Sequence, residues 1–534
     1  MYIVSRLGFE FSENRNSEHE DNVPMIARLQ ARWLELRSAS PAAHSFHAAA
    51  GIIVSCLLLF HIWLVTAGLW TALPPTTNYY AALATAFSHG HLFLEIAPAP
   101  EVLDLPNPYD PAERSGIDVP GDVSLYNGKY YLYFGPVPAL ILAGLKPLWA
   151  GDIGDGEIVF AFVAGIFVFQ YVLLLRLRRR FFPSLPGWTF LIGIGLIGLQ
   201  TPITSMLGSP SIHEASIAGG QFFFIGGFYF ALVALDQGFA RIRSLILVGI
   251  FWAASVGTRT TQLVPIGVMI LLLLAWIAKD SLQKETASRA RPAFLGLLAP
   301  IMLLTMGLLW YNWARFGSLF EFGLRYQLTW NDIHDPNQIL FSPLYILQNS
   351  YNYLLAPFRI ARLFPFIMVY YGRGISVISA INLPAIYHPD KVVGLIYSTP
   401  FLLLAALPTA FTLRKLLKTT DLNTDQRALN RISISFVGIV LAASIPLLFF
   451  FWNVERYMAD FIPALTLLSV VGFWQGHVLL TEKGALRQLY SLAASAVALV
   501  SMGLTMLLAV SMGLDRFRLF NPELIHWLRN SLGG

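Results

Sequence analysis

A polar stretch between two apolar runs carries several carboxylates with the right chemistry for proton transfer. It contains Asp104, Asp110, Asp118 and Asp122, and Lys129 follows them. A carboxylate that reaches an acceptor hydroxyl can act as a general base. Aspartate also begins turns, and the string NPYDP around Asp110 is typical of a turn. We therefore expect a catalytic base among Asp104, Asp110 and Asp122, with a structural role as the alternative for each.

Three further charged residues stand at the edges of apolar runs. Glu214 lies in GSPSIHEAS, Arg259 in VGTRTTQ and Arg456 in FWNVERYMADF. Charges at a membrane boundary are costly unless they are paired or functional, and a guanidinium group binds phosphate through two parallel hydrogen bonds. We expect Glu214 to join the catalytic group, and Lys129, Arg259 and Arg456 to bind a phosphate. The alternatives are a helix-start carboxylate for Glu214, an interfacial side chain for Arg259 and a local ion pair for Arg456.

The composition limits which class of protein can position these residues. The chain has 534 residues, of which 56% are hydrophobic and only 13% are charged, against about 25% charged residues in soluble domains. A soluble enzyme, a disordered chain and a nucleic-acid-binding protein are therefore excluded as expectations. The one cysteine, Cys56, allows no disulfide within the chain. His213 beside Glu214 does not make a metal site, and we predict no metal ligands.

Apolar runs long enough to cross a membrane recur along the chain. We predict eleven spans, at 48–70, 156–175, 188–208, 215–236, 244–257, 262–278, 293–312, 393–413, 432–451, 458–478 and 489–511. The run 132–150 is rich in glycine and proline, and we expect it to lie at the interface without crossing. This predicts an all-α, polytopic membrane protein.

The distribution of basic residues predicts the orientation. With eleven spans, five connectors of 58 residues in total hold 17 Lys and Arg on one side, whereas the long connector 71–155 holds three on the other. The positive-inside rule then places the N-terminus in the cytoplasm. We expect a cytoplasmic segment 1–47, a membrane domain 48–511 with two outer regions at 71–155 and 313–392, and an amphipathic outer tail at 512–534.

This arrangement resembles the GT-C superfamily of polytopic glycosyltransferases. The strings NPYDP, SLYNGKYYLYFGPVPAL, RFGSLFEFGLRYQL and ERYMADFIPAL look like those of uncharacterised bacterial members. Protein O-mannosyltransferases and the aminoarabinose transferases of lipid A have a similar architecture. The resemblance implies a polyprenyl-phosphate sugar as donor, with the site at the outer face.

Single positions match this family in part. Glu214 matches an acidic residue in the second outer loop, Arg259 a basic residue in a short hairpin, and Arg456 the arginine of a late Arg-Tyr pair. Members often place an acidic residue soon after the first span, where this chain has Asn78. The departure leaves the identity of the base open among the aspartates of the first outer region.

The sequence thus predicts a glycosyltransferase in the cytoplasmic membrane of a bacterial cell envelope. Its expected partners are membrane lipids, the polyprenyl-phosphate sugar and an acceptor of unknown identity, with no nucleic acid. No nucleotide-binding motif is present, so we expect no nucleotide cofactor, and a divalent metal stays open. The alternatives are a transporter or flippase for a lipid-linked glycan, a glycan polymerase or ligase, and a scaffold without catalysis.

Overall fold

The computed structural model describes residues 41–148, 153–283, 287–335, 337–369, 383–417 and 423–532. Most of the expected cytoplasmic segment 1–47 therefore lies outside the described residues. The chain divides into two compact units, Met1–Ile52 and Ile53–Gly534. The described part of the first unit is the beginning of one helix, and the second unit holds everything discussed below.

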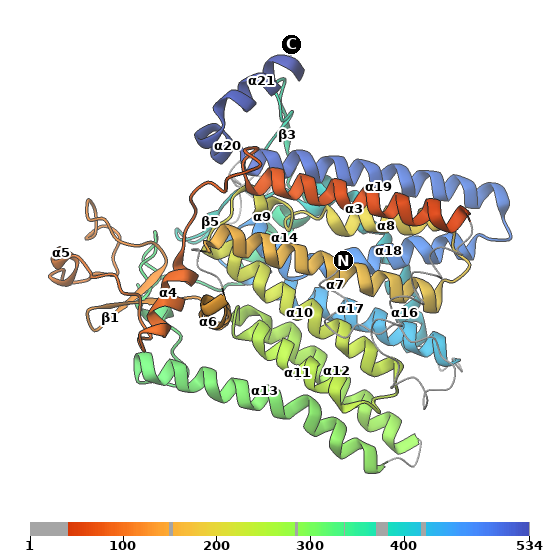
Figure 1. The fold of residues 1–534 in the computed structure, drawn as a ribbon, viewed down its shortest axis with the longest axis horizontal. Helices are drawn as coiled ribbons and strands as arrows, with labels where there is room; N and C mark the ends of the chain where they lie inside the picture. The colour runs from red at the N-terminus through yellow and green to blue at the C-terminus, as the bar shows by residue number, and fades with distance from the viewer. Residues whose placement is uncertain are drawn as a thin grey trace. The chain divides into compact units, whose positions relative to one another are not determined.

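Long apolar helices dominate the second unit (Figure 1). Within the described residues, eight helices are long and apolar enough to cross a membrane. They are α3 (Pro41–Val65), α7 (Asp155–Phe181), α10 (Ile212–Asp236), α12 (Leu263–Gln283), α13 (Ala287–Phe316), α17 (Thr424–Phe449), α18 (Ile462–Leu479) and α19 (Gly484–Met512). The expected fold class, an all-α multi-pass membrane protein, is confirmed.

The expected number of eleven spans is not confirmed, because three of the predicted spans form short or broken helices. These are α8 (Gly187–Gly198), α11 (Ile242–Val256) and a segment divided into α15 (Leu395–Ser398), η6 (Pro400–Ala405) and α16 (Ala406–Leu417). Pro400 provides a reason for the last division, because proline cannot donate a helical hydrogen bond. The run 132–150 contains α6 (Val137–Leu145) and η2 (Lys146–Leu148), which are too short to cross.

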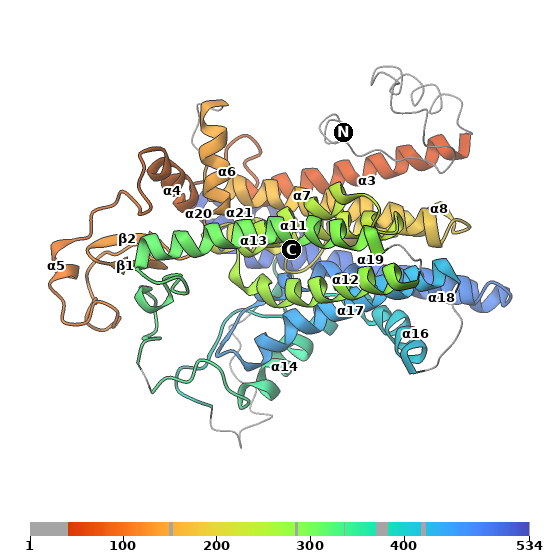
Figure 2. The ribbon, with the colours of Figure 1, turned by 90° about the horizontal axis from the view of Figure 1, so that it is seen from below.

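Irregular segments gather at one end of the helices, which we call the loop end (Figures 1 and 2). The first outer region forms α4 (Tyr79–Ser88), α5 (Pro100–Leu103) and an antiparallel hairpin of β1 (Val123–Tyr126) and β2 (Lys129–Leu132). Asn127 and Gly128 turn this hairpin with positive φ angles of 48° and 70°, as expected for a two-residue turn. The hairpin was not predicted from the sequence.

The second outer region and the connecting turns supply the remaining short elements. They are η4 (Leu324–Tyr326), α14 (Tyr345–Leu355), the two-residue strands β3 (Arg359–Ile360), β4 (Ile367–Met368), β5 (His388–Pro389) and β6 (Trp452–Asn453), and α9 (Ser205–Gly208), η3 (Thr260–Gln262) and η7 (Glu455–Asp460). The tail forms α20 (Leu514–Phe520) and α21 (Pro522–Leu532).

One hydrophobic core joins the loop end to the helices. Leu83 of α4 and Val123 of β1 share it with Ile158 of α7, Ala215 of α10 and Phe517 of α20. Burying apolar side chains from all these elements in one cluster stabilises their relative positions. The loop end is therefore a packed part of the second unit, and it can hold side chains in a fixed geometry.

Candidate functional site

Asp122 begins the β1–β2 hairpin at the loop end. Its φ angle is 57°, a left-handed conformation that aspartate adopts more readily than most residues. Its backbone N–H donates to the carbonyl of Leu328 at 3.2 Å, and the N–H of Leu328 donates to Val123 at 2.8 Å. The Nε2 of Gln327 donates to Oδ1 of Asp122 at 3.3 Å. The two outer regions together therefore fix the position of this carboxylate.

The imidazole of His213 pairs with the carboxylate of Asp122. Its Nε2 lies 3.1 Å from Oδ2 of Asp122, and the two side chains are 29% and 23% exposed. His213 occupies the first turn of α10, where Ser211 caps the helix and accepts a hydrogen bond from its backbone N–H at 3.3 Å. The edge of the ring faces Phe134, with 5.3 Å between centroids. The pair is thus anchored by local structure and still reachable by a substrate.

Glu214, the next residue, is buried and connects this pair to an arginine. Ser211 Oγ donates a short hydrogen bond to its Oε2, and Nη1 of Arg456 lies 3.7 Å from its Oε1. That distance is longer than an ordinary hydrogen bond, so charge alone joins the two groups. The Nε of Arg456 is buried and has no acceptor within the described residues. Asp122 and Asp390 also act on Arg456 by charge. The guanidinium therefore lies among negative charges, and its Nε still has no hydrogen-bond acceptor within the described residues.

Arg259 has a different environment, because its charge is already matched. Its Nε lies 3.2 Å from both oxygens of Asp460, and its Nη2 lies 3.2 Å from Oδ2. Thr261 Oγ1 and Gln262 Nε2 donate to the same carboxylate at 3.2 and 2.7 Å. Arg259 therefore fastens the α11–α12 turn to η7, the element that carries Arg456.

Two tyrosines fill the space between these charged groups. Burial raises the pKa of Tyr133 to about 12, and Asp122 and Arg259 act on it by charge in opposite directions. Burial also raises the pKa of Tyr457, against the influence of Arg456 and Arg259. Both hydroxyls are therefore neutral at ordinary pH, and they can donate hydrogen bonds without adding charge to the site.

The backbone brings Tyr133 to this position through a close approach of two turns. The N–H of Val137 donates to the carbonyl of Gly257 at 3.2 Å. A Cβ at Gly135 would collide with that same carbonyl, so glycine is required there. Arg259 follows Gly257 by two residues, which places the Tyr133 segment and the Arg259 turn side by side.

The other sequence candidates of the first outer region lie apart from this cluster. Asp104 is exposed at the end of α5. Asp110 accepts from the N–H of Ala112 at 2.8 Å and closes the turn of NPYDP. Lys129 sits in the hairpin with its Nζ 4.2 Å from the ring centroid of Phe93. The structure thus brings together Asp122, Glu214, Arg259 and Arg456, and it leaves these three in other contacts.

A carboxylate does lie beside Asn78, although it comes from another element. Asp155, the first residue of α7, is fully buried, and its oxygens accept from the backbone N–H groups of Tyr79 and Tyr80 at 3.2 and 3.4 Å. A helix start leaves such N–H groups without partners and attracts negative charge. Asp155 therefore caps α4 from a distance of 76 residues in sequence, a contact that the local sequence around Asn78 does not reveal.

A cavity of about 420 Å³ lies in the first outer region. Tyr79, Asp118, Pro120 and Tyr130 contribute to its lining. Asp122 follows Pro120 by two residues and acts by charge on Tyr79. Residues close to Asp122 in sequence thus line a cavity that has room for a small molecule.

The described residues contain no group of three or more His, Cys, Asp or Glu side chains placed to hold a metal ion. The cluster at the loop end consists instead of one carboxylate–imidazole pair and two carboxylate–guanidinium pairs. Such a set can accept a proton and can stabilise an anion.

Comparison with known proteins gives distant structural neighbours only. No family model and no curated protein matches the chain. An apo oligosaccharyltransferase from Archaeoglobus fulgidus matches 87% of this chain with 13% identity and a TM-score of 0.44, and this chain covers 56% of its length. The oligosaccharyltransferase AglB of that organism, with an inhibitory peptide and a dolichol-phosphate, matches over the same shares with 12% identity and a TM-score of 0.44.

ArnT from Cupriavidus metallidurans in the apo state matches 87% of this chain and 76% of its own, with 12% identity and a TM-score of 0.41. All three neighbours are less than 25% identical to this chain. Their TM-scores are below 0.5, so the function is argued from the residues of this chain.

Proposed function

We propose that this protein transfers a sugar from a polyprenyl-phosphate donor to an acceptor hydroxyl at the loop end, with inversion at the sugar carbon. One observation carries the proposal. The Asp122–His213 pair and the Glu214–Arg456 pair are joined through adjacent residues of α10, at 3.1 and 3.7 Å. A group that accepts a proton thus lies beside a group that can hold a departing phosphate, as glycosyl transfer from a phosphate donor requires.

Asp122 is the general base in this scheme. The acceptor oxygen attacks the anomeric carbon and forms the new glycosidic bond, while its proton passes to the Asp122 carboxylate. His213 and Gln327 contact the two oxygens of that carboxylate and hold it in one orientation. Such a positioned base contributes about 10²–10⁴-fold to the rate.

Arg456 stabilises the leaving group. As the bond between the anomeric carbon and the phosphate oxygen breaks, its electron pair stays on the lipid phosphate. Arg456 is suited to this anion because its Nε has no acceptor and its contact with Glu214 is long. A fixed cation costs little reorganisation when negative charge develops.

Arg259 acts in this scheme through position. Its hydrogen bonds to Asp460 hold η7, and its guanidinium lies 5.6 Å from the ring centroid of Tyr457, the residue after Arg456. Lys129, Asp104 and Asp110 are left outside the proposed reaction centre because their contacts lie elsewhere. The 420 Å³ cavity lined by Tyr79 is the proposed entry for the acceptor.

The proposal includes the location of the reaction. The connectors richest in Lys and Arg lie at the other end of the helices, and the positive-inside rule assigns that end to the cytoplasm. The loop end then faces outward from the cytoplasmic membrane, and the N-terminus lies inside. A lipid-phosphate donor supplies an activated sugar on that side without any nucleotide.

The test uses the full chain purified into nanodiscs and a panel of synthetic polyprenyl-phosphate sugars with a cell-envelope extract as acceptor. Release of polyprenyl phosphate and transfer of labelled sugar are measured for the wild type, Asp122→Asn and Asp110→Asn. We expect the first variant to lose about 10²–10⁴-fold in kcat. Asp110→Asn is the matched control, because it makes the same change in an aspartate that closes a turn outside the proposed centre.

Two outcomes would contradict the proposal. Wild-type protein that transfers no sugar from any polyprenyl-phosphate donor would exclude the reaction. Full activity of both Asp122→Asn and Glu214→Gln would exclude the proposed centre while leaving the reaction class standing.

A further inference from the structure

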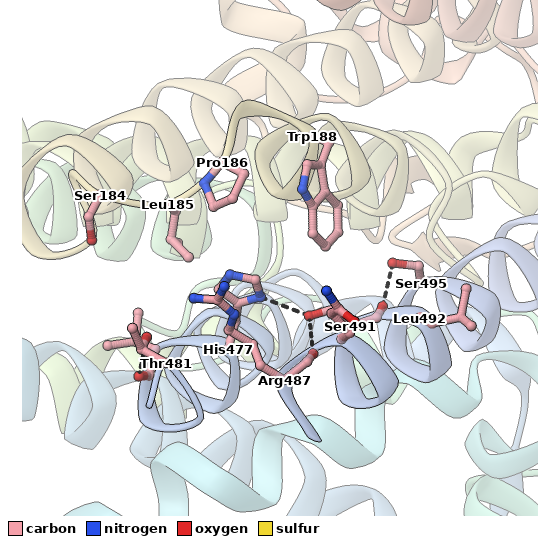
Figure 3. A pocket seen from close by; sticks show the side chains of 12 residues that line it. Ser184, Leu185, Pro186, Trp188, His477, Thr481, Arg487, Ser491, Leu492 and Ser495 are labelled. Carbon is pink, nitrogen blue, oxygen red and sulfur yellow. Dashed lines mark hydrogen bonds between the residues drawn. The ribbon is translucent and has the colours of Figure 1, made fainter. Parts of the chain in front are cut away.

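A second cavity lies at the other end of the helices, which we call the basic end. Its volume is about 540 Å³, and it opens between the start of α8, the end of α18 and the start of α19 (Figure 3). α7 connects the two ends: its first residue, Asp155, caps α4 at the loop end, and the chain after its last residue, Phe181, leads into the cavity at Ser184. Its 27 residues span about 40 Å, so this cavity is remote from the proposed reaction centre.

The lining of this cavity suits an anion. It contains the cation Arg487, the imidazole of His477 and several hydroxyl and amide groups, and it includes no carboxylate. Within the described residues, the guanidinium of Arg487 has no acceptor or ion-pair partner. Arg487 also lies in the first turn of α19, where the helix dipole is unfavourable for a cation and favourable for an anion. A bound anion would satisfy both the side chain and the helix start.

His477 adds a hydrogen-bond acceptor of defined direction. Ser491 Oγ donates to the carbonyl of Arg487 at 2.7 Å, so it accepts from Nδ1 of His477, which lies 2.8 Å away. With the ring hydrogen on Nδ1, the second nitrogen, Nε2, keeps a free lone pair. It has no partner within the described part of the chain. A hydroxyl of the ligand would complete this contact, next to a phosphate at Arg487.

Exposed apolar side chains lie at and beside the rim of the cavity. Leu492, which lines the cavity, is 70% exposed, and Leu489 one turn earlier is 64% exposed. Trp188 stands at the rim with its ring edge-on to His477, at 5.9 Å between centroids. Tryptophan is enriched where a membrane meets water. Exposed leucines beside a cation-lined cavity are the pattern expected for acyl chains below a headgroup.

We propose that this cavity binds the headgroup of an anionic phospholipid, with the phosphodiester at Arg487 and a headgroup hydroxyl at His477 Nε2. Anionic lipids are enriched in the cytoplasmic leaflet, where basic residues near the membrane surface attract them. A soluble phosphate would not use the exposed leucines, which is why a lipid fits the observations better. The proposal takes the basic end as cytoplasmic, which rests on the orientation proposed above, and it does not depend on the glycosyl transfer itself.

The experiment measures lipid binding by the full-length protein in nanodiscs of phosphatidylcholine. Phosphatidylglycerol carries both a phosphodiester and hydroxyl groups, and it is the probe. Its retention is followed by native mass spectrometry, and its affinity by titration against thermal unfolding. We expect Arg487→Gln to weaken phosphatidylglycerol binding about tenfold or more, as loss of a charge-assisted hydrogen bond does. His477→Gln is expected to weaken it less.

Arg243→Gln is the matched control. Arg243 is exposed in the first turn of α11 at the same end of the helices and lies outside the cavity lining, so the control removes equal charge without touching the site. Equal binding by the Arg487 and Arg243 variants would overturn the proposal. Stabilisation of the wild type by inorganic phosphate as strong as that by phosphatidylglycerol would overturn its lipid part and assign the cavity to a soluble anion.

Discussion

The loop end and the basic end of the helices use charge in different ways. At the loop end, Arg259 and Asp460 are 10% and 5% exposed and come from turns that are 201 residues apart. At the basic end, Arg176 and Arg180 pair with Asp236 while remaining 25% and 26% exposed. A buried charge depends on its partner, whereas a charge that is a quarter exposed can still contact water. The charged side chains of the loop end are therefore held in a fixed geometry, whereas those of the basic end can contact a surface outside the protein.

We first compare the loss of unfolding free energy when one carboxylate is removed from each end. This comparison has the largest expected effect. Asp460→Asn leaves Arg259 buried beside a neutral amide, and we expect a loss of about 3–5 kcal/mol in unfolding free energy. Asp236→Asn removes a partner of two arginines that are about a quarter exposed, and Arg180 keeps its contact with Asp425 at 3.3 Å, so about 1 kcal/mol or less is expected. Thermal and denaturant unfolding of the full chain in detergent measures both changes. Equal destabilisation by the two variants would contradict the distinction between the ends.

A second comparison lies within the loop end, between Arg456, which the sequence nominated for phosphate, and an exposed arginine. Arg456→Gln removes the guanidinium with an unpartnered Nε, and we expect kcat to fall about 10²–10³-fold. Arg325→Gln is the control, because Arg325 is 83% exposed in the second outer region. The rate of polyprenyl-phosphate release measures the effect. If the Arg456 variant loses stability but its folded fraction releases polyprenyl phosphate at the wild-type rate, Arg456 has a structural role instead.

The sequence predicted the fold class because apolar run length is a strong local signal. The helical spacing of apolar residues over Asn78–Ser88 also predicts a helix at the interface, and α4 is observed at Tyr79–Ser88. The sequence-based prediction missed the β1–β2 hairpin, although the pair Asn127-Gly128 between Tyr-rich runs is a hairpin signal. The spans that failed as long helices contain proline or glycine near their ends, where tertiary packing decides the local structure.

The site shows which residue roles cannot be predicted from the local sequence. Asp110 and Asp122 are the same residue type in loops of similar composition, and only the fold shows that Asp122 meets His213, 91 positions later. Likewise Arg259 and Arg456 were equal candidates, and the depth of their carboxylate partners separates them. His213 was the weaker member of its sequence pair because a lone histidine carries no spacing pattern. Contacts between distant segments decide all three cases.

The last prediction concerns Glu455, a carboxyl at the loop end whose effect appears as a change of stability with pH. It is buried, Ser205 Oγ lies 3.5 Å from its Oε1, and its Oε2 has no partner within the described residues. Burial raises its pKa from 4.5 to about 8, against the hydrogen bond from Ser205. Between these two pH values the unfolded chain releases the proton and the folded chain keeps it. The stabilising contribution is therefore complete below about pH 4.5 and is lost as pH rises towards 8.

Glu455→Gln keeps the shape of the neutral acid and removes its titration. We expect the melting temperature of the wild type in nanodiscs to fall by a few degrees more than that of the variant between about pH 5 and pH 8. Glu482→Gln, at an exposed position, should leave the slope of the wild type unchanged. Parallel slopes for the wild type and Glu455→Gln would mean that the buried carboxyl ionises in the folded chain as readily as in the unfolded chain, and they would contradict the expected pH dependence.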